Sequence, residues 1–196
     1  MSLTRADPTT QPVSSAEAKT HLRIDADMTS EDATITSIIK VATEAVQVFT
    51  RRQFTQATFT LYLDSFTPND TDTIRLPRPP LSSLTTFQYI NDDGDLTTVT
   101  ASDYTTDTDT EPGRLYLAYD KSWPSFRAIR KAIKIVYVAG YSTVPEDVKH
   151  AILLLCGDLY ERREAQTETV MGTRVQDNPT VERLLWGQRF LGEVDL

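Results

Sequence analysis

The sequence predicts an α+β fold: a helical core built from the N- and C-terminal helices, with an inserted antiparallel β-domain between them. Apolar residues recur at three- and four-residue steps near both ends of the chain, and at two-residue steps in its middle. The 196 residues are 39% hydrophobic and 24% charged, which is typical of a globular protein with one domain or a small domain carrying an insertion.

The N-terminal quarter predicts an arm followed by two helices. Residues 1–13 are polar, contain two prolines and predict an extended N-terminal arm. Ser14 and Glu17 have the spacing of a capping box, so a short helix is expected from there to about Leu22. A longer helix is expected from residues 30–32 to about residue 52. Its apolar stripe consists of Ile35, Ile38, Ile39, Ala42, Ala45, Val46 and Phe49.

The middle of the chain predicts strands, because apolar and polar residues alternate and threonine is frequent. Asp93-Gly94 lies between two such runs and predicts a tight hairpin turn, since glycine supplies the positive φ that the turn requires. The expected strands are 58–64, 74–76, 84–90, 96–100, 115–119 and 132–138.

The C-terminal part predicts two more helices. Pro145, Glu146 and Asp147 suit the first turn of a helix that extends to about Glu164. A polar linker follows, and a last helix is expected to begin at Pro179. The predicted organisation has four parts. Residues 1–13 form an N-terminal arm, and residues 14–55 with 144–165 form the helical core. Residues 56–143 form the inserted β-domain, and residues 166–196 form a C-terminal linker and docking tail.

Composition excludes several classes of protein. No apolar run reaches the length of about 20 residues that a membrane-spanning helix needs, and the first residues lack the apolar stretch of a signal peptide. Cys156 is the single cysteine, so neither an internal disulfide nor a cysteine-based zinc site is expected, and a reducing intracellular origin is favoured. The net charge of −8 argues against a generic nucleic-acid-binding protein.

Candidate catalytic or metal-binding residues are few, and each has a simpler interpretation. Glu17, His21 and Asp25 share one helix face, where a solvated, ion-paired surface is favoured over a metal site or general base. His150 and Cys156 differ by about 120° around their helix, so Cys156 is expected to be a buried core residue. The sequence therefore predicts no catalytic site, no metal site and no cofactor.

Charge is distributed unevenly along the chain. Residues 79–113 contain seven acids and no lysine or arginine, which predicts an acidic surface at one tip of the β-domain. This acidic surface consists of Asp92, Asp93, Asp95, Asp103, Asp107, Asp109 and Glu111. The next segment is basic and is a candidate inter-subunit patch, since oppositely charged surfaces can pair between neighbours in a ring. The basic patch consists of Arg127, Arg130, Lys131 and Lys134.

The C-terminal tail is unusually apolar for a chain end. Its apolar residues are Leu184, Leu185, Trp186, Phe190, Leu191, Val194 and Leu196. Two interpretations remain open from the sequence: the tail folds back onto the core, or it inserts into another protein, where tryptophan is a common anchor.

The order of several short motifs over residues 14–165 resembles the head–tail connector (adaptor) protein family of long-tailed phages and phage-derived particles such as gene transfer agents. The segment Lys19-Thr20-His21-Leu22-Arg23-Ile24-Asp25 is similar to the family's opening, and Leu76-Pro77 to Leu81 is similar to its proline-rich segment. Further matching segments are 31–32, 51–54, 136–141, 144–152 and 159–164. The tail after residue 165 matches less clearly.

The resemblance implies a non-enzymatic structural protein. Members of the family assemble as a ring, expected to be a dodecamer, beneath the portal protein in the neck of a virion or phage-like particle, after synthesis in the bacterial host cytoplasm. The ring extends the DNA channel, and DNA passes through without specific binding. It also provides a platform for a stopper or tail-completion protein, and no membrane is involved. Trp186, Phe190, Leu191 and Leu185 are then the candidate portal-docking residues.

Two alternatives belong to other classes. A carbohydrate- or peptide-binding module would require Tyr62, Tyr89, Tyr104 and Tyr116 to converge in a groove of the β-domain. A hydrolase would require a site built from aspartate and histidine side chains, such as His21 or His150.

Overall fold

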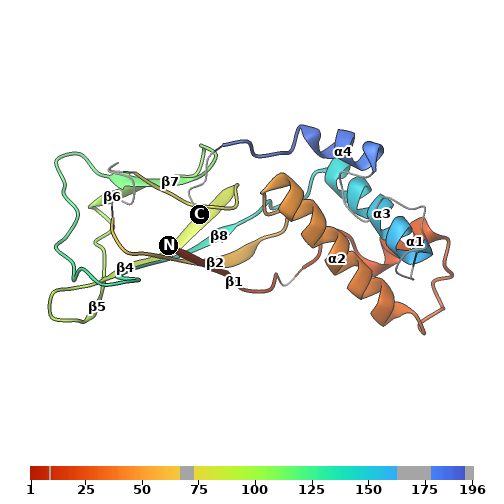
Figure 1. Cartoon of the computed structure of the whole chain (residues 1–196), viewed down its shortest axis with the longest axis horizontal. Coiled ribbons are helices and arrows are strands. Elements are labelled where there is room, and N and C mark those ends of the chain that lie inside the picture. Colours follow the sequence, from red (N-terminus) through yellow and green to blue (C-terminus); the bar gives the residue numbers. More distant parts are fainter. Residues whose placement is uncertain (9, 67–72, 163–177, 193–196) are drawn as a thin grey trace, which may run out of the picture. The chain divides into compact units, whose positions relative to one another are not determined.

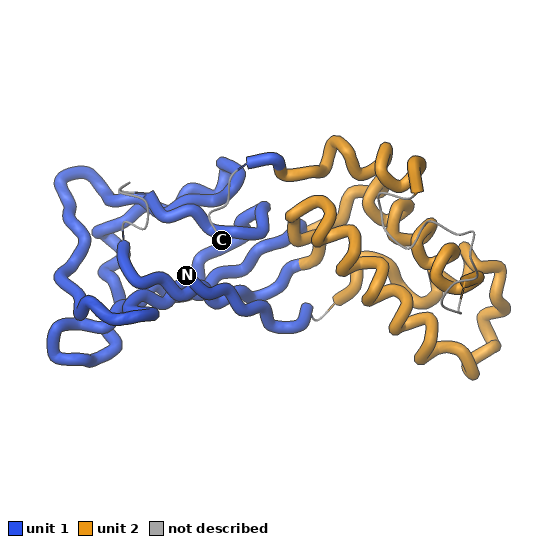
Figure 2. The backbone as a smooth tube through the Cα atoms, in the orientation of Figure 1, with its two compact units in different colours: residues 1–9, 56–141, 191–196 blue, residues 10–55, 142–190 orange. Residues whose placement is uncertain are grey.

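The computed structural model describes residues 1–8, 10–66, 73–162 and 178–192, and these residues form two compact units. Figure 2 shows the β unit (residues 1–9, 56–141 and 191–196) in blue and the helical unit (residues 10–55 and 142–190) in orange. The α+β fold is confirmed. The observed division differs from the predicted one at both termini, because the expected arm contributes to the β unit and the last helix belongs to the helical unit.

The described part of the helical unit contains four helices, two from each side of the β insertion (Figure 1). Their bounds are α1 (Ser15–Leu22), α2 (Asp32–Thr50), α3 (Glu146–Glu161) and α4 (Pro179–Trp186). The capping box at α1 is confirmed: the Ser14 hydroxyl accepts from the Glu17 amide at 3.2 Å, and the Glu17 carboxylate accepts from the Ser14 amide at 2.7 Å. α1 and α2 both end where an arginine, Arg23 or Arg51, adopts the left-handed conformation.

Small and branched side chains fill the interface between α2 and α3. Ile35, Ile39 and Val46 from α2 are buried, as are Val148 and Ile152 from α3. α1 packs against both of these helices, and α4 packs chiefly against α3. The apolar stripe expected for the longer N-terminal helix is therefore its core-facing side.

The described part of the β unit contains eight strands in two antiparallel sheets. The strands are β1 (Ser2–Arg5), β2 (Ala57–Leu63), β3 (Thr73–Arg75), β4 (Leu81–Ile90), β5 (Leu96–Thr98), β6 (Tyr104–Asp107), β7 (Arg114–Leu117) and β8 (Ile133–Ala139). The larger sheet has the order β1-β2-β8-β4-β5, and the smaller has the order β3-β7-β6.

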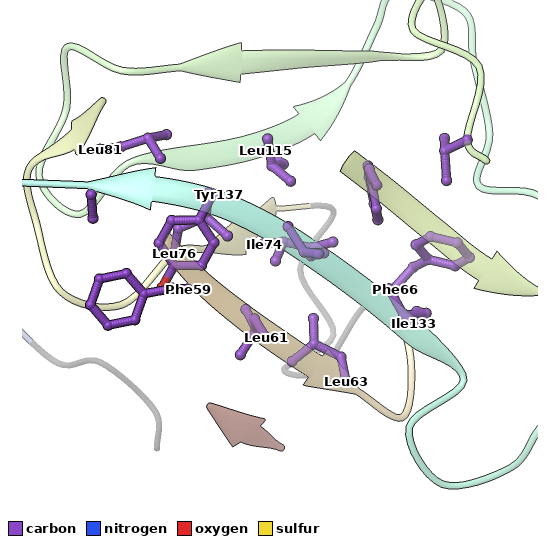
Figure 3. Close-up of a cluster of buried hydrophobic side chains, with 14 of the residues drawn as sticks. Phe59, Leu61, Leu63, Phe66, Ile74, Leu76, Leu81, Leu115, Ile133 and Tyr137 are labelled. Carbon is purple, nitrogen blue, oxygen red and sulfur yellow. The ribbon is translucent and has the colours of Figure 1, made fainter. Parts of the chain in front are cut away.

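Alternation along the strands places one set of side chains in the core. Along β2 and β8, every second residue is buried, as the two-residue period predicts. Figure 3 shows Phe59 and Leu61 from β2 beside Tyr137 from β8; the rings of Phe59 and Tyr137 stack at 5.5 Å between centroids. The Tyr137 hydroxyl is buried and donates to the Pro77 carbonyl oxygen at 2.8 Å, so the phenol is satisfied within the core.

Two strands were not expected from the sequence. β1 comes from the predicted arm, and its four residues pair with β2 from Ser2 opposite Tyr62 to Arg5 opposite Phe59. β6 pairs with β7, and its sequence Tyr-Thr-Thr-Asp is too short and polar to show a clear apolar period. β1 depends on a partner distant in sequence, which local patterns do not reveal. β6 pairs with the next strand, and only its short polar sequence hides it.

Candidate functional site: the assembly surfaces

The C-terminal helix is held in the helical unit by its own cap and its apolar face. The Asn178 side chain accepts from the amides of Thr180 and Val181, both at 3.2 Å, and its amide group donates to Asp158 Oδ2 at 2.9 Å. Val181 and Leu185 are fully buried. α4 is therefore part of the helical core.

The residues after α4 are bonded to both long helices. The Phe190 amide donates to the Thr50 carbonyl at 2.8 Å, and Arg52 Nε donates to the Gln188 carbonyl at 2.6 Å. The Gln188 side chain donates to Asp147 Oδ2 at 2.9 Å. The tail thus folds back as far as Phe190, which is itself buried.

Burial divides the four candidate portal-docking residues into two groups. Leu185 and Phe190 fill the core of their own unit, so neither presents a docking surface. Trp186 is 60% exposed and Leu191 is 76% exposed. Val194, Leu196 and the linker residues 166–177 lie outside the described residues.

Trp186 is exposed but its ring is positioned by a cation. The Arg189 guanidinium lies 5.2 Å from the centre of the Trp186 ring and 4.9 Å from the centre of the Phe49 ring on α2. A guanidinium between two aromatic faces restrains both rings through cation–π attraction. Trp186 is therefore a solvent-facing aromatic side chain whose ring is restrained by Arg189.

The acidic surface lies on three turns of the β unit. Asp92, Asp93 and Asp95 occupy the β4–β5 hairpin turn, which is confirmed: the Gly94 amide donates to the Asn91 carbonyl at 3.0 Å, and Gly94 has a φ of 98°. All three acids are exposed. Asp103 follows β5, Asp107 is the last residue of β6, and Asp109 and Glu111 lie in the turn after it.

Some of these acids have partners within the unit. Lys121 Nζ lies 3.0 Å from Asp103 Oδ1, and this hydrogen bond lowers the pKa of the Asp103 carboxyl group. The Thr110 hydroxyl donates to Asp107 Oδ2 at 2.9 Å and lowers the pKa of Asp107 in the same way. Both groups are therefore ionised at neutral pH.

The basic residues do not gather into one patch. Arg127 lies beside the acidic hairpin: its amide donates to the Ile90 carbonyl at 3.0 Å, and a Cβ placed on Gly94 would be 2.9 Å from its guanidinium. Lys131 and Lys134 instead meet at Tyr62, with Lys131 Nζ 5.4 Å from the ring centre and Lys134 opposite Tyr62 in the sheet.

Arg130 and Lys131 also line a small hollow of about 310 Å³ together with Met1, Ser2 and Asp64. Asp64 Oδ1 accepts from the Lys131 amide at 2.7 Å. Within one subunit, Arg127 of the basic segment thus already lies beside the acidic hairpin. Lys131 and Lys134 lie at Tyr62 instead.

The two histidines and the cysteine of the helical unit were the candidates for a catalytic site. His21 packs edge-on against His150 at 6.2 Å between ring centroids. Cys156 is buried, as predicted, and desolvation raises the pKa of its thiol to about 12, so the nucleophilic thiolate is scarce at neutral pH. Within the described residues, no group of three or more histidine, cysteine or acidic side chains has the arrangement of a metal site.

The four tyrosines of the ligand-binding alternative lie apart. Tyr89 and Tyr104 pack against core rings, at 5.9 Å from Phe66 and 5.2 Å from Phe87. Tyr62 lies under Lys131, and Tyr116 is partly exposed on the smaller sheet. Tyr89 and Tyr104 are thus partly buried against the core of the unit, and the ligand-binding alternative is not favoured. None of the described helices is both long and apolar enough to cross a membrane.

Comparisons with known proteins give a family match and a shared fold. Residues 13–182 match the family model described as "HCP: Head completion protein". No curated protein matches the chain. The fold is similar to a structure described as the neck of an empty GTA particle computed with C6 symmetry, with a TM-score of 0.80 and 23% identity over 100% of this chain and 98% of the other.

Two further structures have the same fold. One, described as the neck of a native GTA particle computed with C12 symmetry, has a TM-score of 0.75 and 22% identity, covering 100% of this chain and 98% of the other. The other, described as the virion of a native gene transfer agent particle, has a TM-score of 0.74 and 24% identity with the same coverage.

Proposed function

The chain belongs to the head completion protein family and is a structural head–tail connector; on that premise we propose that it forms a ring beneath the portal of a tailed phage or phage-like particle. The ring extends the DNA channel and provides the platform for a stopper or tail-completion protein. The observation that carries the proposal is the family match over residues 13–182, which includes both units. The role is structural, with no chemical reaction.

The particle neck is the proposed location. The similar structures described as GTA necks, with C6 or C12 symmetry, support both this location and a closed ring of many copies. Electron microscopy of the purified protein, alone and mixed with its portal protein, tests the proposal. Rings alone or beneath the portal are expected, with twelve copies as the expected number, and monomers in both samples would overturn the proposal.

The exposed ring of Trp186 is the proposed anchor for portal docking. Deleting the whole tail is a poor test, because residues 179–190 include the buried Val181, Leu185 and Phe190. Trp186→Ala removes only a side chain that is mostly exposed. We expect it to abolish co-sedimentation with the portal protein while the circular dichroism spectrum is unchanged.

A matched control for this test is Tyr119→Ala, since Tyr119 is 98% exposed and lies in the β unit. This variant should retain portal binding. Equal binding by the Trp186 and Tyr119 variants would contradict the docking assignment and leave the ring proposal in place.

The acidic turns of the β unit are proposed to face the DNA path, where negative charge prevents the phosphate backbone from adhering. Asp93→Asn with Asp95→Asn removes two exposed charges from the hairpin, and Asp25→Asn with Asp27→Asn removes two exposed charges from the helical unit as a control. The hairpin variant should retain more DNA at low salt in a filter-binding assay of assembled rings. Equal retention by both pairs would place the DNA path elsewhere.

A further inference from the structure

Arg189 holds a positive charge over two aromatic rings of the helical unit. Its guanidinium lies 4.9 Å from the centre of the Phe49 ring and 5.2 Å from the centre of the Trp186 ring. Arg189 is half-buried, and its backbone amide donates to the Trp186 carbonyl at 3.3 Å. We call these residues the Arg189 platform (Phe49, Trp186 and Arg189).

The chain on both sides of Arg189 is held in place. The Gln188 carbonyl accepts from Arg52 Nε at 2.6 Å. On the other side Phe190 is buried, and its amide donates to the Thr50 carbonyl at 2.8 Å. The platform is therefore arranged before a partner binds, which reduces the entropic cost of binding.

The guanidinium of Arg189 forms no hydrogen bond or ion pair with any residue that the structure describes. A guanidinium carries several N–H donors in one plane and no acceptor. Cation–π attraction uses its charge and leaves these donors without acceptors. A partner that supplies an anionic acceptor therefore gains hydrogen bonds that this chain does not make by itself.

Acidic side chains of the surrounding helices do not neutralise Arg189. Asp147 Oδ2, at the start of α3, accepts instead from a glutamine side chain at 2.9 Å. Glu182 on α4 forms no ion pair with the guanidinium. On α2, Glu44 points about 140° away from Phe49 around the helix. Among the described residues, the charge on the platform is therefore left for an external group to pair with.

A carboxylate is the group that fits the Arg189 platform. Its two oxygens match the parallel N–H donors of a guanidinium and form a bidentate pair. Trp186 is 60% exposed, so a partner that pairs with Arg189 also covers apolar surface beside it, and excluding water strengthens the pair. Arginine and tryptophan are the residue types most enriched at the centres of protein interfaces. A phosphate can also pair with arginine, but the adjoining Trp186 ring is assigned to a protein partner.

We infer that the Arg189 platform binds a carboxylate group of the portal protein. The occupant is a portal segment that carries an aspartate or glutamate, paired with Arg189, next to an apolar side chain that covers the Trp186 ring. The inference rests on the proposed function and deepens it, because it names the chemical group that the docking surface recognises. Arg189 is then a binding residue as well as a restraint on the Trp186 ring.

The charge is tested by Arg189→Gln in the full-length chain. We expect the dissociation constant for the portal protein to rise about tenfold or more. The salt dependence of docking should also be weaker than in the wild type, because salt screens an ion pair. If Arg189 only restrained the Trp186 ring, docking would weaken with its salt dependence unchanged. Arg183→Gln is the matched control: it removes the same charge from an exposed site on α4, and it should keep both the affinity and the salt dependence.

The chemical nature of the partner group is tested by Arg189→Lys and a carbodiimide, which joins an amine to a carboxylate only where the two are in contact. The reaction is run at a protein concentration at which this variant docks on the portal protein. We expect mass spectrometry of the digested complex to show an amide bond between position 189 and an aspartate or glutamate of the portal. The wild type is the control, since a guanidinium does not react, and it should give no product at this position.

The outcomes separate the carboxylate contact from docking itself. An unchanged affinity or an unchanged salt dependence in the Arg189→Gln variant would overturn the inference and leave docking through Trp186 in place. Equal losses in the Arg183→Gln variant would show a general attraction between charges, which also overturns it. So would a product joined to Glu193 or Asp195 of the same chain, or a docked complex with no product at position 189. Wild-type protein that does not bind the portal would overturn docking and the inference together.

Discussion

The two units differ in the kind of side chain that fills their interiors. In the β unit the fully buried side chains are aromatic and aliphatic, among them Phe59, Phe66 and Phe87. In the helical unit six polar residues are buried as well. Within the described part of the chain, all buried polar or charged residues belong to that unit: Lys19, Thr43, Gln47, Thr50, Gln53 and Thr55.

The buried polar groups fix the geometry of the helical unit more than they stabilise it. Lys19 Nζ forms an ion pair with Asp32 and donates to the Met28 carbonyl at 2.9 Å, which ties the α1–α2 connection to α1. The Thr50 hydroxyl donates to the Val46 carbonyl at 2.7 Å in the last turn of α2. Such bonds contribute about 1 kcal/mol each, less than burial of a large apolar side chain.

The surfaces of the two units do not show the same contrast. Large apolar side chains are exposed on both, among them Leu96, Tyr119 and Ile129 in the β unit and Val41, Val48 and Trp186 in the helical unit. The comparison therefore concerns the interiors: the apolar core of the β unit and the mixed core of the helical unit.

The chain contains one tryptophan in each unit, Trp123 and Trp186, so the two units can be followed separately. In a Trp186→Phe background, fluorescence reports the β unit, and in a Trp123→Phe background it reports the helical unit. Urea unfolding of these two single-tryptophan proteins is the measurement used for the following predictions.

Phe66→Ala is expected to have the largest effect, about 3–5 kcal/mol of unfolding free energy. The Phe66 ring stacks on Trp123 at 5.0 Å and meets Phe126 at 5.4 Å, so its removal leaves a cavity and detaches the loop that carries these two residues. The Trp123 transition should move more than the Trp186 transition. Equal shifts would show that the units unfold as one and would weaken the comparison.

Leu185→Ala should destabilise the helical unit by about 2–4 kcal/mol, because Leu185 is fully buried. The Trp186 transition reports the loss. Leu191→Ala removes the same atoms from a side chain that is 76% exposed and should change stability by less than about 0.5 kcal/mol. A similar effect of both changes would contradict the burial of α4.

Gly113→Ala should cost the β unit about 1–3 kcal/mol through overpacking. A Cβ at Gly113 would lie 2.4 Å from the Cβ of Leu81, so the strand or the turn must shift. Gly187→Ala is the control in the helical unit, since nothing lies within 4 Å of the added carbon. An unchanged urea midpoint in the Gly113 variant would show that the β unit is less tightly packed than the comparison holds.

Ser14→Ala should have the smallest effect, about 1 kcal/mol at pH 7, by removing the cap of α1. The Ser14 hydrogen bonds lower the pKa of Glu17, so this stabilisation is present above the pKa of the unfolded chain and is lost as the pH falls through the folded value. The difference between wild type and variant should therefore shrink at acidic pH. Ser37→Ala, at an exposed site within α2, should show no such pH dependence.

Elements defined by local signals were predicted well. The capping box at Ser14, the stripe of α2 and the Asp93-Gly94 hairpin each depend on residues within a few positions of one another, so their spacing was sufficient. β1 was missed because its hydrogen bonds go to a strand distant in the chain, and β6 because its four residues are too short and polar to show a period. The exposed valines of α2 were not predicted, because the apolar stripe on its other side already accounts for an amphipathic helix.

The sequence by itself determined the α+β order, the insertion of the strands between helices, the acidic turns and the buried state of Cys156, because periodicity, turn chemistry and local charge are written in neighbouring residues. The tertiary structure alone decided which tail residues are core and which are surface, since the same apolar segment divides into the buried Leu185 and the exposed Trp186. It also brought Arg127 to the acidic hairpin. Burial and charge pairing depend on which distant segments meet, and that follows from packing of the whole unit.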